Sequence, residues 1–135
     1  MQPYYLKYLD CKYTWHGRTY PNLDCMGLII YHFKDILNIE LPDFLNYPNN
    51  EHRGTDKEYI DIYKSWSNLF KIIDLSDVQK NDIFGIKNNC PDINHLGLAI
   101  DDKFFIHILE GANCNIQRIS KWRKRIATVA RYRGL

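Results

Sequence analysis

The spacing of apolar residues changes along this chain from a helical period to a strand-like one, and this change limits the fold more than any other feature. Before residue 74, apolar side chains recur at intervals of three and four residues, as in amphipathic helices. Afterwards, short apolar or alternating runs are separated by polar turns, as in strands. This order predicts an α+β fold, with N-terminal helices packed on an antiparallel β-sheet. With no repeat or linker in sight, we expect a single domain over residues 1–135.

Two helices are predicted before the strands. The first begins after Asp24, whose carboxylate can cap the unpaired amides of the first turn, and Pro42 ends it at or before the next loop. A polar stretch over residues 46–56 is predicted as an exposed loop, and a second helix over residues 57–73. The apolar stripe of the first helix consists of Met26, Ile29, Ile30, Phe33, Ile36 and Leu37, and that of the second of Tyr59, Ile62, Tyr63, Trp66, Leu69, Phe70 and Ile73.

The remaining pattern predicts five strands, over residues 82–86, 95–100, 104–109, 115–119 and 126–132. Hydrophobic residues make up 45% of the chain and charged residues 25%, which excludes a disordered or low-complexity chain. No run reaches the roughly 18 apolar residues of a membrane span, and the first residues lack the apolar run of a signal peptide. The net charge of +2 gives no indication of a nucleic acid partner. We therefore expect synthesis in a cytoplasm, where the four cysteines stay free thiols.

Cys25 is the first candidate for chemistry. It follows the predicted cap directly, so its thiol lies at the positive end of the helix dipole, which favours the nucleophilic thiolate. The alternative is that Cys25 is a small apolar residue that packs the start of the helix.

A cysteine nucleophile needs a base, and the base needs an orienting group. His95 and His107 lie in neighbouring predicted strands, and their separation is even. A three-residue loop over residues 101–103 places both imidazoles on one face of the hairpin, whereas a two-residue loop places them on opposite faces. The alternative is two unrelated strand histidines with satisfied hydrogen bonds.

Four segments of the chain together resemble the NlpC-type cell-wall cysteine peptidases, compact papain-like enzymes that cut peptide bonds in bacterial peptidoglycan. They are residues 13–17 (Tyr-Thr-Trp-His-Gly), 23–28 (Leu-Asp-Cys-Met-Gly-Leu), 95–100 (His-Leu-Gly-Leu-Ala-Ile) and 105–107 (Phe-Ile-His). They occur in the family's order over most of the chain. The resemblance implies a papain-like domain in which the helix that carries the cysteine packs on the antiparallel sheet.

The resemblance also implies roles for individual residues. Cys25 is the nucleophile, His95 the general base and His107 the group that orients the His95 ring. Tyr13 lines the site, and Asp24 faces a substrate ammonium group in addition to capping the helix. The backbone amide of Cys25 is the natural oxyanion donor.

Two residues depart from the family pattern. Met26 stands where members that recognise the free amine of a trimmed stem peptide usually have Ser, which puts a preference for any one stem-peptide bond in doubt. His16 stands in place of a Gly, where it either crowds the cleft or makes an extra polar contact with substrate.

The flanking residues resemble the branch of the family found in tail-assembly proteins of long-tailed bacteriophages. These flanks are Gly17-Arg18 with Tyr20, residues 38–43 (Asn-Ile-Glu-Leu-Pro-Asp), residues 107–111 (His-Ile-Leu-Glu-Gly) and residues 130–133 (Ala-Arg-Tyr-Arg). The branch implies a peptidase carried in the virion tail, with peptidoglycan stem peptides and other tail-tip proteins as partners. One alternative is a structural tail-tip subunit with the same fold and little or no hydrolase activity. Another is a host enzyme that recycles stem peptides in the cytoplasm.

Two weaker patterns complete the survey. Cys90, His95, His107 and Cys114 are suitable residue types for zinc, but their spacing matches no usual knuckle, and we predict no metal and no cofactor. Residues 121–125, with Arg131 and Arg133, form a basic tail that is either a solvated face or a contact for an anionic wall polymer or a tail subunit.

Overall fold

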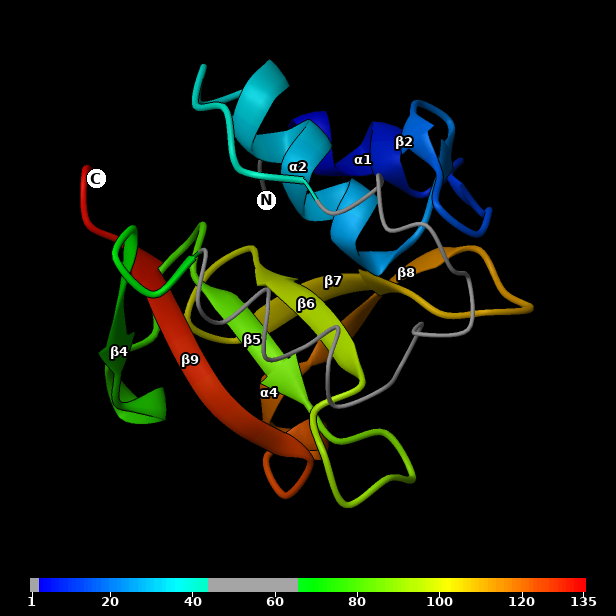
Figure 1. Cartoon of the computed structure of the whole chain (residues 1–135). Helices are drawn as coiled ribbons and strands as arrows, with labels where there is room; N and C mark the ends of the chain where they lie inside the picture. The colour runs from blue at the N-terminus through cyan, green and yellow to red at the C-terminus, as the bar shows by residue number, and fades with distance from the viewer. Residues whose placement is uncertain (1–2, 44–65) are drawn as a thin grey trace.

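The computed structural model describes residues 3–43 and 66–135 (Figure 1). Its helices are α1 (Pro3–Tyr8), α2 (Cys25–Asp35) and α4 (Ile119–Trp122), with a 3-10 turn, η2 (Leu75–Asp77). A small sheet contains β1 (Lys12–Tyr13), β2 (Arg18–Thr19) and β3 (Asn22–Leu23). The main sheet contains β4 (Phe70–Ile73), β5 (Ile83–Ile86), β6 (His95–Ala99), β7 (Phe104–Ile108), β8 (Cys114–Arg118) and β9 (Ile126–Tyr132).

The main sheet confirms the predicted α+β class. Its strand order is β4-β9-β5-β6-β7-β8, and every neighbouring pair is antiparallel. The five predicted strands are present within one or two residues at their ends. The small sheet was not predicted, because strands of two residues are too short to show a period.

The main sheet has a hydrophobic cluster on each face. Helix α2 packs over β6 and β7, with α1 beside it, as Figure 1 shows. On this face Leu98, Ile106 and Ile108 are fully or almost fully buried with Leu28 and Phe33 of α2. On the opposite face, Phe84, Ile86, Ala99, Phe105 and Val129 pack with Ile119 and Trp122 of α4. Successive side chains along a strand therefore pack in different clusters, one on each face of the sheet.

Helix α2 starts where the sequence predicts and ends before the predicted apolar stripe does. Its cap is Asp24, and its last residue is Asp35. Asn38 takes a left-handed backbone conformation with φ 56°, and the Ile39 amide donates to the carbonyl of Phe33 at 2.9 Å. The Phe33 carbonyl also accepts from the Leu37 amide at 3.2 Å, and this closing pair of bonds turns the chain away well before Pro42.

The predicted second helix is wrong at its C-terminal end. Most of residues 57–73, and the predicted loop 46–56, lie outside the described residues. Phe70–Ile73 form strand β4, which pairs with β9 from Phe70↔Tyr132 to Ile73↔Val129. The Phe70 ring packs against Phe33 and Tyr132, with centroids 6.0 and 5.6 Å away. These tertiary contacts outweigh the helical spacing of a short apolar segment.

Helix α1 was not predicted, and a buried polar cluster ties it to α2. Tyr8 Oη lies 3.0 Å from His32 Nδ1, and His32 Nε2 lies 2.8 Å from Asn81 Oδ1. The Tyr5 ring stacks on the His32 imidazole. Burial lowers the pKa of His32 to about 4, so His32 is neutral at pH 7 and accepts from one neighbour while it donates to the other.

Candidate active site

Cys25 is the first residue of α2. One carboxylate oxygen of the preceding Asp24 accepts from the Gly27 amide at 2.7 Å, which confirms the predicted cap. As a residue Cys25 is partly exposed, whereas its neighbours Asp24 and Met26 are buried. Its sulfur is nevertheless enclosed by the fold, at a helix start whose first amides have no partner within the helix.

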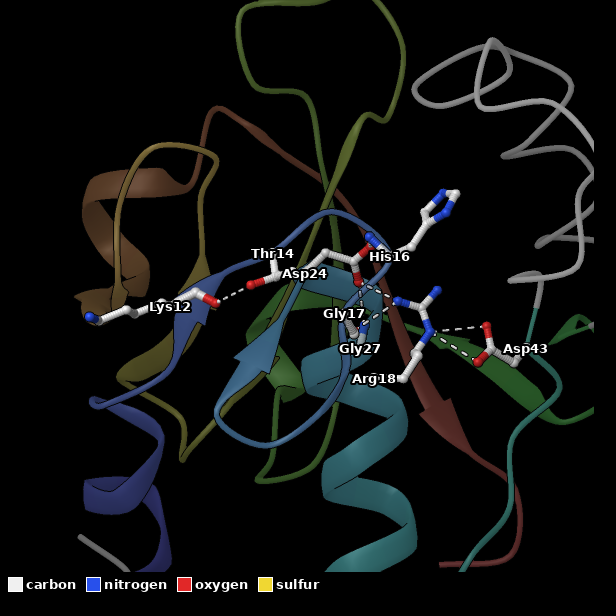
Figure 2. A network of polar contacts seen from close by, with 8 residues as sticks. All are labelled: Lys12, Thr14, His16, Gly17, Arg18, Asp24, Gly27 and Asp43. Atoms are coloured by element: carbon white, nitrogen blue, oxygen red, sulfur yellow. Dashed lines mark hydrogen bonds and ion pairs between the residues drawn. The ribbon is translucent and has the colours of Figure 1, made fainter.

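Arg18 is paired with the same carboxylate. Arg18 Nη1 donates to Asp24 Oδ1 at 2.7 Å, while Arg18 Nε donates to both carboxylate oxygens of Asp43 (Figure 2). The second Asp24 oxygen, Oδ2, accepts from the His16 amide at 3.2 Å. Both oxygens of Asp24 are thus engaged within the chain. A contact between Asp24 and a substrate ammonium group stays a prediction.

Gly27 allows the chain before α2 to lie on the first turn of the helix. A Cβ at Gly27 would overlap the main-chain carbonyl of Gly17, and a Cβ at Gly17 would overlap that of Asn22. The segment that bears His16 and Arg18 is therefore seated directly on the helix start.

His95 and His107 contact each other, as predicted for a hairpin with a three-residue loop. Ile100 and Phe104 bracket a three-residue loop, and the Ile100 amide donates to the Phe104 carbonyl at 2.9 Å. His95 Nε2 lies 2.8 Å from His107 Nδ1, and their ring centroids are 5.0 Å apart. His95 is 5% exposed and His107 is fully buried. The spatial pairing is confirmed, while the catalytic roles stay predictions.

The ladder between β6 and β7 ends near this pair. It includes Leu98↔Ile106 and Ala99↔Phe105 and does not extend to the first residues of β6. By the alternation of an antiparallel ladder, the Leu96 amide would otherwise point at the carbonyl of Ile108. Instead, the amides of Leu96 and Met26 face the Cys25 sulfur and act to lower the pKa of its thiol. Because the ladder ends there, the Leu96 amide is free to face Cys25, and Leu96 is the residue that follows His95.

The surroundings favour the neutral forms of Cys25 and of the two histidines, His95 and His107. Burial is the main cause that raises the pKa of the Cys25 thiol to about 12, and the Asp24 charge adds to it. Burial also lowers the pKa of His95 to about 3 and that of His107 to about 4. The expected thiolate at the helix start is therefore wrong for the resting state, because desolvation outweighs the amides.

Two residues on the opposite side of His107 were not singled out by sequence reasoning. Asn115 stands directly opposite His107 in the β7–β8 register, and its Oδ1 lies 3.1 Å from His107 Nε2. The Trp122 ring meets the His107 ring edge-to-face at 4.8 Å. The hairpin spacing around Gly111 was the signal that could have paired Asn115 with His107. No local pattern places Trp122 there.

The other predicted site residues are ordered around the start of α2. Tyr13 stands opposite Leu23 in the small sheet and is half-buried. His16 has a left-handed backbone with φ 59°, and its ring lies against Trp15 and, as Figure 2 shows, points away from Asp24. Only the His16 main chain contacts Asp24. Roles for Tyr13 and His16 in binding substrate stay predictions.

The zinc alternative finds no cluster to support it. Within residues 3–43 and 66–135, no three side chains of the types His, Cys, Asp or Glu come together to hold a metal ion. His95 and His107 bond each other, and Cys114 is buried near Cys11. In the same part of the chain, no helix is long and apolar enough to cross a membrane.

The basic tail divides into bound and exposed residues. Arg131 donates from Nε and Nη2 to the buried carboxylate of Asp82, each at 2.9 Å. The Arg125 guanidinium lies over the Trp122 ring, 4.6 Å from its centroid. Arg131 is therefore a structural residue, contrary to its inclusion in a solvated or polymer-binding face, while Lys121 and Arg133 are exposed.

A cysteine at the start of a helix, packed on an antiparallel sheet that carries a histidine pair, defines a papain-like α+β domain. The chain belongs to the NlpC/P60 family, which matches residues 10–131. No curated protein matches the sequence.

Solved structures agree with this family. The NlpC/P60 domain of the peptidoglycan hydrolase SagA has a TM-score of 0.59 and 16% identity, over 93% of this chain and 89% of that one. An NLP/P60 family protein of Staphylococcus aureus, described as similar to a lipoprotein, has a TM-score of 0.65 and 17% identity, over 94% of this chain and 38% of that one. NlpC2 from Trichomonas vaginalis has a TM-score of 0.67 and 21% identity, over 94% of this chain and 44% of that one. At these identities the structures show a common fold, and this chain spans less than half of the last two proteins.

Proposed function

We propose that this protein is a cysteine endopeptidase that hydrolyses peptide bonds in the stem peptides of bacterial peptidoglycan. The observation that carries the proposal is the Cys25 thiol at the start of α2, faced by the amide of Leu96, the residue that follows His95 of the buried His95–His107 pair. Membership of the NlpC/P60 family and the fold shared with the domain of a peptidoglycan hydrolase support the substrate class.

The reaction begins from the neutral pair. His95 takes the proton of the Cys25 thiol as the sulfur attacks the carbonyl carbon of the substrate amide. The amide of Cys25, at the helix start, donates to the developing oxyanion. The tetrahedral intermediate collapses to a thioester, and the His95 imidazolium returns the proton to the leaving amine. His95 then activates a water molecule, which hydrolyses the thioester and releases the thiol.

The proposal is tested by digesting purified, peptide-crosslinked peptidoglycan and reading the products by mass spectrometry. The wild-type protein and Cys25→Ala are compared, with Cys90→Ala as the matched control because Cys90 is also a partly exposed cysteine. We expect new stem-peptide fragments from the wild type and Cys90→Ala, and none from Cys25→Ala. If the folded wild type releases no fragments, the peptidase is refuted and the structural subunit becomes the better interpretation.

We further propose that the enzyme belongs to the tail of a long-tailed bacteriophage and opens the wall locally while the genome enters. The support comes from two of the flanking segments that resemble that branch. Arg18 of the first segment is bonded to Asp43 of the second, which links both to the start of α2 through Asp24. Mass spectrometry of purified virions from the source phage tests the proposal. Absence of the chain from intact virions would favour a host enzyme instead.

A further inference from the structure

A chain of hydrogen bonds continues from the histidine pair into β8. The main-chain carbonyl of Asn113 can only accept, so the Asn115 atom that faces it, at 3.4 Å, is Nδ2. The other carboxamide atom is then Oδ1, which accepts from Gln117 Nε2 at 2.9 Å and faces His107 Nε2 at 3.1 Å. The contact to the Asn113 carbonyl thus sets the orientation of the Asn115 amide, and Gln117, whose own carboxamide can turn, is placed to donate to it.

This orientation determines where the protons of both imidazoles lie. Because Asn115 Oδ1 can only accept, His107 carries its hydrogen on Nε2, and neutral His107 has a lone pair on Nδ1. His107 Nδ1 therefore accepts from His95 Nε2 across the 2.8 Å contact. The hydrogen of neutral His95 is on Nε2, which leaves Nδ1 of His95 unprotonated.

We propose that Asn115 is a positioning residue that fixes the Nε2–H tautomer of both His107 and His95 and so keeps His95 Nδ1 ready to accept a proton. The inference deepens the proposed peptidase and rests on it for its catalytic meaning. When the Cys25 proton reaches His95 Nδ1, the Nε2–H of the resulting imidazolium is already donated to His107. The Trp122 ring on the His107 ring holds the His107 imidazole in the plane that Asn115 requires.

The test measures tautomers directly, by long-range ¹H–¹⁵N correlation spectra of the histidine rings at about pH 8, where histidines are neutral. In the wild type we expect Nε2 protonated and Nδ1 unprotonated in both rings. Asn115→Leu removes the acceptor at similar size and is expected to shift both Nδ1 signals toward the protonated form. Asn115→Asp keeps an acceptor oxygen and is expected to retain the wild-type tautomers. Asn22→Leu, the same change at an exposed strand position, is the control and should leave the rings unaltered.

Two results would overturn the proposal: wild-type rings protonated on Nδ1, or Asn115→Leu rings with unchanged tautomers. If Asn115→Leu does not fold, Nδ1–H signals in Asn115→Asp overturn it equally. For peptidoglycan hydrolysis we expect Asn115→Leu to lower kcat by roughly 10-fold to 100-fold with little change in KM, and Asn115→Asp to restore most of the loss. The spectra need no substrate, so the two proposals can fail separately. If the tautomers depend on Asn115 but the protein does not cleave peptidoglycan, only the proposed peptidase is refuted. An active protein whose tautomers ignore Asn115 refutes this inference alone.

Discussion

Arg18 and Asp24 form an ion pair at the start of the helix that bears the cysteine, with 2.7 Å between Arg18 Nη1 and Asp24 Oδ1. Both side chains are largely buried, and the same carboxylate oxygen accepts from the Gly27 amide. Arg18 offsets part of the effect that the Asp24 charge has on the Cys25 thiol. Both carboxylate oxygens of Asp24 therefore have partners within the chain.

Removing the Asp24 carboxylate should cost more than removing that of Asp43. Asp24→Ala loses the cap and leaves Arg18 with only Asp43 and the Gly17 carbonyl, so we expect the free energy of unfolding to fall by about 2 kcal/mol. Asp24→Asn keeps an oxygen for the Gly27 amide and should lose about 1 kcal/mol. Asp43→Ala breaks a more exposed pair and should lose about 0.5 kcal/mol. Urea unfolding measures all three, and equal losses would contradict this order.

Gly27→Ala should destabilise the fold although alanine favours helices. Its methyl group would meet the Gly17 carbonyl, so the segment over the helix start must shift, at a cost of about 2 kcal/mol. Lys34→Ala, at an exposed position of the same helix, is the control and should change stability by less than about 0.5 kcal/mol. A Gly27→Ala protein as stable as the control would show that the close approach is not tight.

Acid should destabilise the protein through its buried histidines. Burial lowers the pKa of His32 from 6.5 to about 4, so between these values the unfolded chain binds a proton that the native chain does not. Stability is therefore present above pH 6.5 and is lost as the pH falls toward 4, by up to about 1.4 kcal/mol per pH unit for each such group. His32→Gln should flatten the dependence of Tm on pH in this window. Parallel curves for the two proteins would refute the assignment.

Cys25 should react slowly with iodoacetamide near neutral pH. Burial raises the pKa of its thiol to about 12. At any pH below that value, the fraction of reactive thiolate therefore increases about tenfold when the pH is raised by one unit. In a Cys90→Ser background, peptide mapping should show a labelling rate at Cys25 that rises steadily from about pH 7 to about pH 9. A rate that is already constant over this range would mean that the resting site holds a thiolate and an imidazolium.

Asp82→Ala should be among the more damaging changes to stability. Asp82 is 1% exposed and accepts from Arg131 and from the Gln79 amide. Its loss leaves both donors without that acceptor, and we expect about 2 kcal/mol less stability. Lys71→Ala, on the exposed side of β4, should be close to neutral. Chemical unfolding of the two variants distinguishes a structural Arg131 from a surface cation.

The contact between the two histidines was partly predictable, because the two-residue period of strands fixes which side chains share a face. The sequence left open whether the loop has two or three residues, and whether the two histidines are related at all. The pairing of Cys25 with the Leu96 amide could not be predicted in the same way. It depends on where the β6–β7 ladder ends, and no local pattern records that point.

The errors have a common physical origin. Residues 70–73 fit a helical stripe, but the site for Phe70 between Phe33 and Tyr132 exists only in the assembled fold. The neutral resting state of Cys25 likewise reflects how deeply the assembled domain desolvates the thiol. The helix dipole is a local effect that the sequence pattern indicates. Burial depends on the whole assembled fold, and the sequence pattern does not show it.

Strand β9 is the last strand in the sequence, yet it lies between β4 and β5 in the sheet. During synthesis, β4 and β5 are made well before residues 126–132. Until β9 is made, the edges of β4 and β5 that pair with it stay unpaired. The sheet becomes continuous only when β9 enters from the C-terminal side. Folding of this domain is therefore a late event in its synthesis, and premature termination before residue 126 would leave two separate edges open to other chains.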